Sequence, residues 1–117
     1  MAVLNRDQIL NAKDIKVEKV HVPEWGGDVY LRVISGADRD EYESFVLQSK
    51  DRGTVKNFRA MLLAKAICDE NGNPIFTNKD IEALGKKNSV VLDRLWQKAM
   101  KLNGLTDEEV EKEKENF

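Results

Sequence analysis

One stretch of this chain is apolar on almost every side, and it limits the possible folds more than any other feature. It runs from Val55 to Asp69, and its polar residues are few; they include Asn57, Arg59, Lys65 and Asp69 itself. A helix with so narrow a polar face is buried over most of its surface. We therefore predict a helix over this stretch, placed at the centre of the molecule with the other elements packed around it.

The chain length agrees with a single core. At 117 residues and 13.4 kDa, roughly 65% of the surface of the unfolded chain can be buried without staples. The single cysteine, Cys68, cannot form an internal disulfide, so we expect a reduced core thiol and a cytosolic compartment. The longest apolar run, Ala60 to Ala64, has five residues, far fewer than the ~20 of a membrane helix. The first residues lack the basic start and apolar run of a signal peptide, so we expect no export.

Two β-rich runs flank a pair of glycines. Ile15–Pro23 and Asp28–Ile34 mostly alternate apolar and polar residues, and Glu24–Gly27 lies between them. Glycines can adopt the positive φ angles of a tight turn, so this pattern predicts a β-hairpin. The alternation slips at Glu18–Lys19, which suggests a bulge, and Pro23 should end the first strand.

The remaining segments read as helices and turns, and together with the hairpin they indicate an α+β fold. Asn5–Ala12 is either a short helix with Ile9 and Leu4 against the body or an arm. Gln48–Thr54 and Asp69–Pro74 have loop compositions, and Ile75–Phe76 is either a third strand or a loop anchor. Helices are expected at Ser35–Leu47, at Thr77–Leu84 closed by a left-handed Gly85, at Ser89–Leu102 ended by Asn103–Gly104, and from Thr106 onward. This organisation predicts an arm at 1–14, a core domain at 15–104 and an acidic helix or tail at 105–117.

No combination of residues in the sequence suggests catalysis. His21 is the only histidine and falls beside Lys19 on the solvated face of the first strand, so no catalytic residues, cofactor site or metal site are expected. The turn from Asp69 resembles a calcium loop, but Pro74 occupies the position that requires glycine. A net charge of −2 and a pI near 5.5 disfavour nucleic-acid binding. Basic residues do cluster, but they are expected to form a solvated face: Arg52, Lys56, Arg59 and Lys65.

Four apolar side chains are candidates for contacts with a partner protein. Trp25 at the hairpin tip either folds back onto the sheet or remains available to a partner, and Tyr30 follows in the second strand. The segment Thr106–Phe117 has six acidic residues, two lysines and only two apolar residues, Val110 and Phe117. Such a segment is either a solvated tail or a partner-binding or linker segment.

The order and spacing of several short motifs resemble the tail assembly chaperones of long-tailed bacteriophages. The matching motifs are the hairpin leading into a helix over 20–43, with VPEWGG and ISGA, and the segment 59–106, with the NG-P-F turn, EALG and LNGLT. The resemblance implies an α+β fold and a non-enzymatic protein that coats the tape measure protein and helps recruit tail tube subunits. It also implies a host bacterial cytoplasmic location and absence from the finished virion, and a homo-oligomer is plausible.

Members of this family are often made in two lengths through a one-base ribosomal slip, and Glu115-Asn116-Phe117 can be encoded by a slippery heptamer. Three other functional classes remain as alternatives. The first is a structural head–tail or minor tail component that is retained in the virion. A small enzyme would need a convergent set of titratable groups, and a transcriptional regulator would need a basic recognition helix. No membrane partner is expected.

Overall fold

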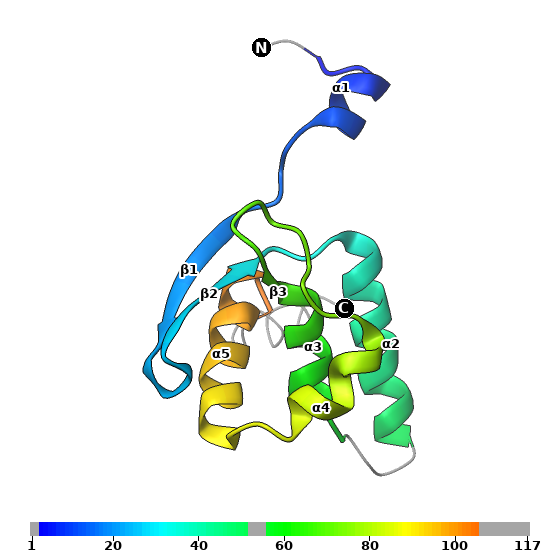
Figure 1. The fold of residues 1–117 in the computed structure, drawn as a ribbon. Helices are drawn as coiled ribbons and strands as arrows, with labels where there is room; N and C mark the ends of the chain where they lie inside the picture. Colours follow the sequence, from blue (N-terminus) through cyan, green and yellow to red (C-terminus); the bar gives the residue numbers. More distant parts are fainter. Residues whose placement is uncertain (1–2, 52–55, 106–117) are drawn as a thin grey trace.

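The computed structural model describes residues 3–51 and 56–105, and Figure 1 shows how its elements are arranged. A three-stranded antiparallel sheet with the order β1-β2-β3 lies against a group of α-helices. This architecture confirms the α+β class. The elements are α1 (Arg6–Asn11), β1 (Val17–Val22), the 3₁₀ turn η1 (Pro23–Trp25), β2 (Gly27–Arg32), α2 (Gly36–Asp51), α3 (Phe58–Ala66), β3 (Ile67–Cys68), η2 (Asn78–Asp80), α4 (Ile81–Gly85) and α5 (Ser89–Leu102).

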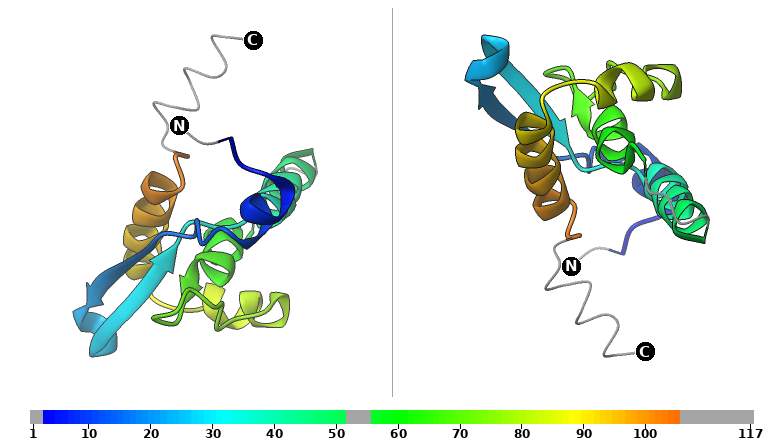
Figure 2. Two further views of the ribbon diagram at one scale, coloured as in Figure 1. Left: turned by 90° about the horizontal axis from the view of Figure 1, so that it is seen from above. Right: turned by 90° about the horizontal axis from the view of Figure 1, so that it is seen from below.

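Helix α3 is the central element, as its composition predicted. Every residue from Ala60 to Ala66 is buried, and the side chains of Leu62 and Leu63 are completely inaccessible. The helix contacts α2, α4 and α5, and it leads directly into β3. The views along the vertical direction of Figure 1 show α3 between α5 on one side and α2 on the other (Figure 2).

The hairpin forms as predicted, but without a bulge. Each residue from Val17 to Val22 pairs with one residue of β2, from Val17 opposite Arg32 to Val22 opposite Gly27. The predicted bulge at Glu18–Lys19 is therefore wrong. Glu18 lies opposite Leu31, and it is exposed because this core-side position is near the start of the strand, before the buried Val20 and Val22.

The turn of the hairpin uses only one of its two glycines in a left-handed conformation. Pro23 ends β1, as expected, and begins η1, after which Gly26 adopts φ 74°. Gly27 is already the first residue of β2. The connection is therefore longer than a two-residue turn, and it contains Trp25 within a short helical turn.

Two predicted boundaries around α3 are wrong. The helix begins only at Phe58, because Asn57 before it is left-handed and not helical. It ends at Ala66, not Asp69, because Ile67 and Cys68 form β3 and pair with β2 at its free edge. The third strand is therefore formed by Ile67 and Cys68, and not by Ile75–Phe76. Phe76 packs partly against the core, which matches the loop-anchor alternative, whereas Ile75 is exposed. The segment Asp69–Pro74, between β3 and Ile75, forms a turn as predicted.

Two other boundaries differ from expectation. Helix α2 continues to Asp51, through part of the predicted loop Gln48–Thr54. Gly85 is the last residue of α4 and does not have a positive φ. A Cβ atom at position 85 would lie too close to Oδ1 of Asn57, the residue that precedes α3 with φ 64°, so a larger residue there requires the Asn57 side chain to move.

The expectation that Lys65 is solvated is also wrong. Its side chain is buried, and its Nζ atom lies 2.9 Å from Glu41 Oε2 and 3.7 Å from Asp38 Oδ1. Arg32 is buried beside it, where Nε donates to the Lys65 carbonyl oxygen at 2.8 Å and Nη2 lies 3.0 Å from Asp38 Oδ2. These charge-assisted contacts join α2 to α3 and β2.

Candidate partner-binding surfaces

The hairpin places Trp25 and Tyr30 on different surfaces. Trp25 is half-buried and packs partly against the core, which agrees with the alternative that it folds back. Tyr30 lies opposite Lys19, and alternation along β2 puts it on the face opposite to that of Val29 and Leu31. It is half-buried there, so part of its ring remains accessible. The fold therefore does not bring these two candidate residues onto one surface.

The solvated face of the hairpin contains a small cluster of ionisable groups. His21 Nδ1 lies 2.7 Å from Asp28 Oδ1, and Lys19 Nζ lies 3.4 Å from Asp28 Oδ2. The hydrogen bond with His21 is the main reason why the pKa of Asp28 is lowered. His21 is exposed, as predicted, and no other described histidine, cysteine or acid joins it to form a possible metal site.

An ion pair links the hairpin tip to α5. Both terminal guanidinium nitrogens of Arg94 donate to the carboxylate of Glu24, with Nη1 2.9 Å from Oε1. This hydrogen bonding lowers the pKa of Glu24 to about 2. The pair ties the turn that contains Trp25 to α5, a link between residues 70 positions apart that the sequence did not suggest.

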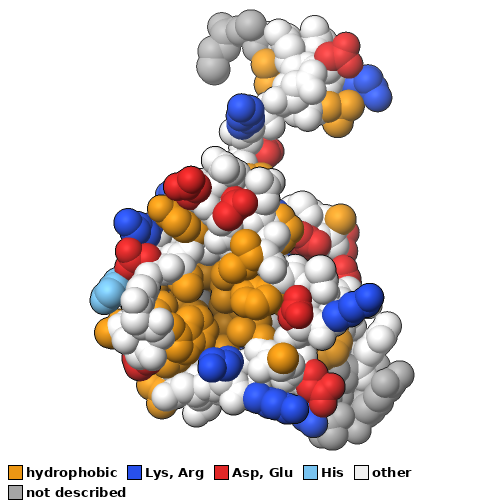
Figure 3. Space-filling model, viewed as in Figure 1, with side chains coloured by type: hydrophobic (Ala, Val, Ile, Leu, Met, Phe, Trp, Pro, Cys, Tyr) orange, Lys and Arg blue, Asp and Glu red, His pale blue; other side chains and the backbone are white. Residues whose placement is uncertain are grey.

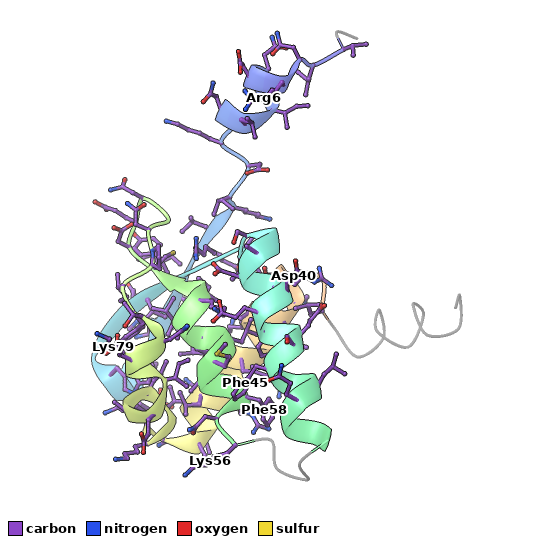
Figure 4. The ribbon with its side chains drawn as sticks, turned by 90° about the vertical axis from the view of Figure 1, so that its right-hand side faces the viewer. Arg6, Asp40, Phe45, Lys56, Phe58 and Lys79 are labelled. Carbon is purple, nitrogen blue, oxygen red and sulfur yellow. The ribbon has the colours of Figure 1, made fainter. Side chains whose placement is uncertain are left out.

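Helix α1 and the residues just before it expose aliphatic side chains, although one alternative predicted Ile9 and Leu4 against the body. Its capping box is complete, since Asn5 Oδ1 accepts from the Gln8 amide and Gln8 Oε1 accepts from the Asn5 amide. None of its residues is buried, and Leu4, Ile9 and Leu10 are 57–64% exposed. Of the two alternatives for this segment, the one in which Ile9 packs against the body is therefore wrong. Arg6 and the rest of α1 stand apart from the body of the domain (Figures 1 and 4).

Apolar side chains also gather on the surface of the main body. On the face shown in Figure 3 they cover a hollowed area between the hairpin and the α4 region. The hairpin carries the half-buried apolar residues Trp25 and Val29, α4 carries Ile81, and the loop before α4 carries Phe76, and all four pack against the core. An exposed apolar area of this kind is typical of a protein–protein contact.

The outer side of α5 carries a second hollow, of about 530 Å³. Trp96 and Met100 supply its apolar surface, and Arg94, Lys98 and Lys101 supply positive charge. Among the described residues, those that line it include no acid. Trp96 is held in place by Phe58, whose ring meets it edge-on at 5.5 Å, and by Tyr42, whose hydroxyl accepts from Trp96 Nε1 at 3.3 Å.

The remaining sequence candidates have mixed outcomes. Cys68 is buried, as predicted, and burial raises the pKa of its thiol, which disfavours the reactive thiolate. The turn after β3 is held by Asp69 Oδ1, which accepts from the amides of Asn71 and Asn73. Val110, Phe117 and the Glu115–Phe117 end lie outside the described residues. No helix in residues 3–51 and 56–105 is long and apolar enough to span a bilayer.

Comparison with known proteins gives a family and a structural relative. The family model described as phage tail assembly chaperone matches residues 5–115. A solved structure described as that of the bacteriophage HK97 tail assembly chaperone is similar, with a TM-score of 0.61 and 26% sequence identity. The alignment covers 82% of this chain and 90% of the HK97 chain. No curated protein gave a significant match.

Proposed function

This chain belongs to the phage tail assembly chaperone family, and on that basis we propose that it binds the tape measure protein of its phage. In this proposal it keeps the tape measure protein soluble before assembly and helps to bring tail tube subunits to it. It does so through non-covalent contacts and catalyses no reaction. A long helical ruler protein has exposed apolar stripes, and a small chaperone bound along them would prevent their aggregation.

The observation that carries this proposal is the unpartnered helix α1. Six helical residues are too few to be stable in water alone, yet none of the residues of α1 is buried in the described part of the chain. Leu4, Ile9 and Leu10 therefore offer an aliphatic surface suited to a second polypeptide. We assign residues 1–14 to a binding arm, 15–104 to the chaperone domain and 105–117 to an acidic tail.

Four further side chains belong to the proposed contact set. Trp25 and Tyr30 present accessible apolar atoms on the two sides of the hairpin. Val110 and Phe117, outside the described residues, are the apolar side chains of the acidic tail. Self-association of the chaperone along the tape measure protein is part of the proposal, because neighbouring copies would then cover a continuous stripe.

Co-expression with the tape measure protein tests the proposal. The soluble fraction of the tape measure protein should increase when this chain is present, and the two should copurify. Ile9→Asp and Tyr30→Glu should reduce both effects. Val90→Asp is the matched control, because Val90 is 66% exposed on α5, outside the proposed surfaces. A tape measure protein that is equally soluble without this chain would contradict the proposal.

Two further observations address the finer points. We expect the chain to act in the host cytoplasm and to be missing from purified virions by mass spectrometry. Its presence there in stoichiometric amounts would instead support a structural head–tail or minor tail component. A slippery heptamer at the codons for Glu115–Phe117, with an overlapping downstream frame, would support a longer form of the protein.

A further inference from the structure

The charge of this chain is divided unevenly between its body and its C-terminal segment. Residues 106–117 contain six acids and two lysines and so carry a net charge of −4. The whole chain has a net charge of −2, which leaves +2 for residues 1–105. An acidic segment attached to a positively charged body is attracted to the basic parts of that body, most strongly at low salt.

The basic residues of α5 form a stripe that leads towards this segment. Arg94, Lys98 and Lys101 follow one another at spacings of four and three residues, so they lie along one side of the helix. They line the hollow on the outer side of α5 together with Trp96 and Met100, and Leu105 completes its lining. Lys98 and Lys101 are exposed, whereas Arg94 is already paired with Glu24. The residues that line this hollow together form the α5 groove.

At the end of α5 the chain lies at the α5 groove, because Leu105 lines it. The Leu105 amide donates to the Met100 carbonyl oxygen at 2.7 Å, and the Gly104 amide donates to the Lys101 carbonyl oxygen at 3.2 Å. With Gly104 at φ 68°, these bonds form a Schellman motif, which ends a helix and turns the chain away from the axis. Leu105 is buried, so the acidic segment starts beside the last turn of α5.

The segment is also long enough to cover the whole groove. From Arg94 to Lys101 the helix rises by roughly 10 Å. Twelve extended residues reach about 40 Å, several times that length. The segment carries carboxylates for the lysines and two apolar side chains, Val110 and Phe117, for Trp96 and Met100.

From this arrangement we infer that residues 106–117 dock in cis on the α5 groove. The carboxylates of the segment then face Lys98 and Lys101, and at least one of its apolar side chains covers the exposed part of Trp96 and Met100. A short tether keeps the effective concentration of the segment near ~1 mM, so even a millimolar intrinsic affinity occupies about half of the grooves. The inference does not depend on the proposed function. It adds that Val110 and Phe117 become available to a partner only when the segment leaves the groove.

A spin label on the segment tests this inference in the full-length chain. Asn116→Cys in a Cys68→Ala background gives one attachment site. Paramagnetic broadening is then measured at the indole N–H signal of Trp96. We expect the Trp96 signal to lose about half of its intensity or more at low salt. The same sample after ascorbate has reduced the nitroxide is the reference, because Trp25 follows Glu24, which pairs with Arg94 in the groove lining, and so lies too near the label to serve as one.

Charge reversal supplies the matched controls. Lys98→Glu with Lys101→Glu should restore the Trp96 signal, and so should 1 M salt, where the Debye length falls to about 3 Å. Lys86→Glu with Lys87→Glu makes the same change in net charge at exposed lysines outside the groove, and it should leave the broadening intact.

Two results would overturn the inference. The first is an unbroadened Trp96 signal in the labelled chain at low salt. The second is broadening that appears only when spin-labelled chains are mixed with isotopically labelled, spin-free chains, because the segment would then dock on a second copy and not in cis.

Discussion

Lys65 Nζ lies 2.9 Å from Glu41 Oε2, although only 7% of the lysine side chain is exposed whereas 47% of the glutamate side chain is. The two ends of this ion pair are therefore solvated very differently. Asp38 Oδ1, at 3.7 Å, is the other carboxylate near the amine. Because a buried charge depends on its partners, the two residues of the pair are not equivalent in what they contribute to stability.

This asymmetry predicts different effects for substitutions on the two sides. Glu41→Ala leaves a buried ammonium group with only the more distant Asp38, and it should lower the free energy of unfolding by about 1–3 kcal/mol. Lys65→Met removes the buried charge and keeps most of the side-chain volume, while water can solvate the carboxylates that remain. It should cost less than about 1 kcal/mol. Urea denaturation of both variants measures the difference, and a larger loss for Lys65→Met would contradict this explanation.

The Glu24–Arg94 pair predicts a pH dependence of stability. The pKa of Glu24 is about 2 in the folded chain against 4.5 for the unperturbed group. Because the folded-state pKa is lower, the carboxylate stabilises the fold above pH 4.5. This contribution is lost as the pH falls from 4.5 towards 2. Glu24→Gln should therefore be less stable than the parent at pH 7, and the difference between them should shrink across this range.

Thermal denaturation of the parent and Glu24→Gln at several pH values measures this dependence. Glu82→Gln is a suitable control, because Glu82 is an exposed glutamate of α4 for which no ion pair is found among the described residues. A stability difference for Glu24→Gln that is the same at pH 7 and pH 2.5 would show that the ion pair is not its source.

Gly85 and Asn57 should be coupled energetically. A methyl group at position 85 collides with the Asn57 side chain, so Gly85→Ala should destabilise the parent by about 1 kcal/mol. In an Asn57→Gly background the obstacle is absent, and glycine also suits the φ of 64° at that position. There Gly85→Ala should be neutral or stabilising by up to about 0.5 kcal/mol, because alanine favours a helix.

A double-mutant cycle in urea measures this coupling. Additive effects of the two substitutions would mean that the Asn57 side chain rotates away at no cost. In that case the small size of Gly85 would not be needed where α4 meets the start of α3.

The local patterns predicted most of the fold because each depended on neighbouring residues. The apolar stretch around Leu62 identified the central helix, Pro23 identified the end of β1, and Asn103–Gly104 identified the end of α5. The errors occurred where distant residues decide the structure. Ile67 and Cys68 favour either a helix or a strand, and the free edge of β2 makes them a strand.

The candidate surfaces were less predictable for the same reason. Whether Ile9 is buried depends on how α1 is oriented relative to β1, which follows it in the chain. The residues of α1 alone do not determine this orientation. Lys65 looked like a solvated residue because lysine usually is one, and the carboxylates of α2 that accept it lie 24 and 27 positions earlier in the chain. The Glu24–Arg94 link likewise joins two segments that come together only in the folded protein.

The exposure of α1 leads to a final prediction that separates stability from binding. Ile9 is 57% exposed and Leu62 is completely buried. Ile9→Ala should change the free energy of unfolding by no more than about 0.5 kcal/mol, whereas Leu62→Ala should lower it by about 2–5 kcal/mol. If α1 is a binding arm, Ile9→Ala should nevertheless weaken copurification with the tape measure protein. Urea denaturation and copurification of the same preparations measure both effects. A marked loss of stability in Ile9→Ala would mean that α1 packs against the body of its own chain, and the helix would then no longer be available as an arm.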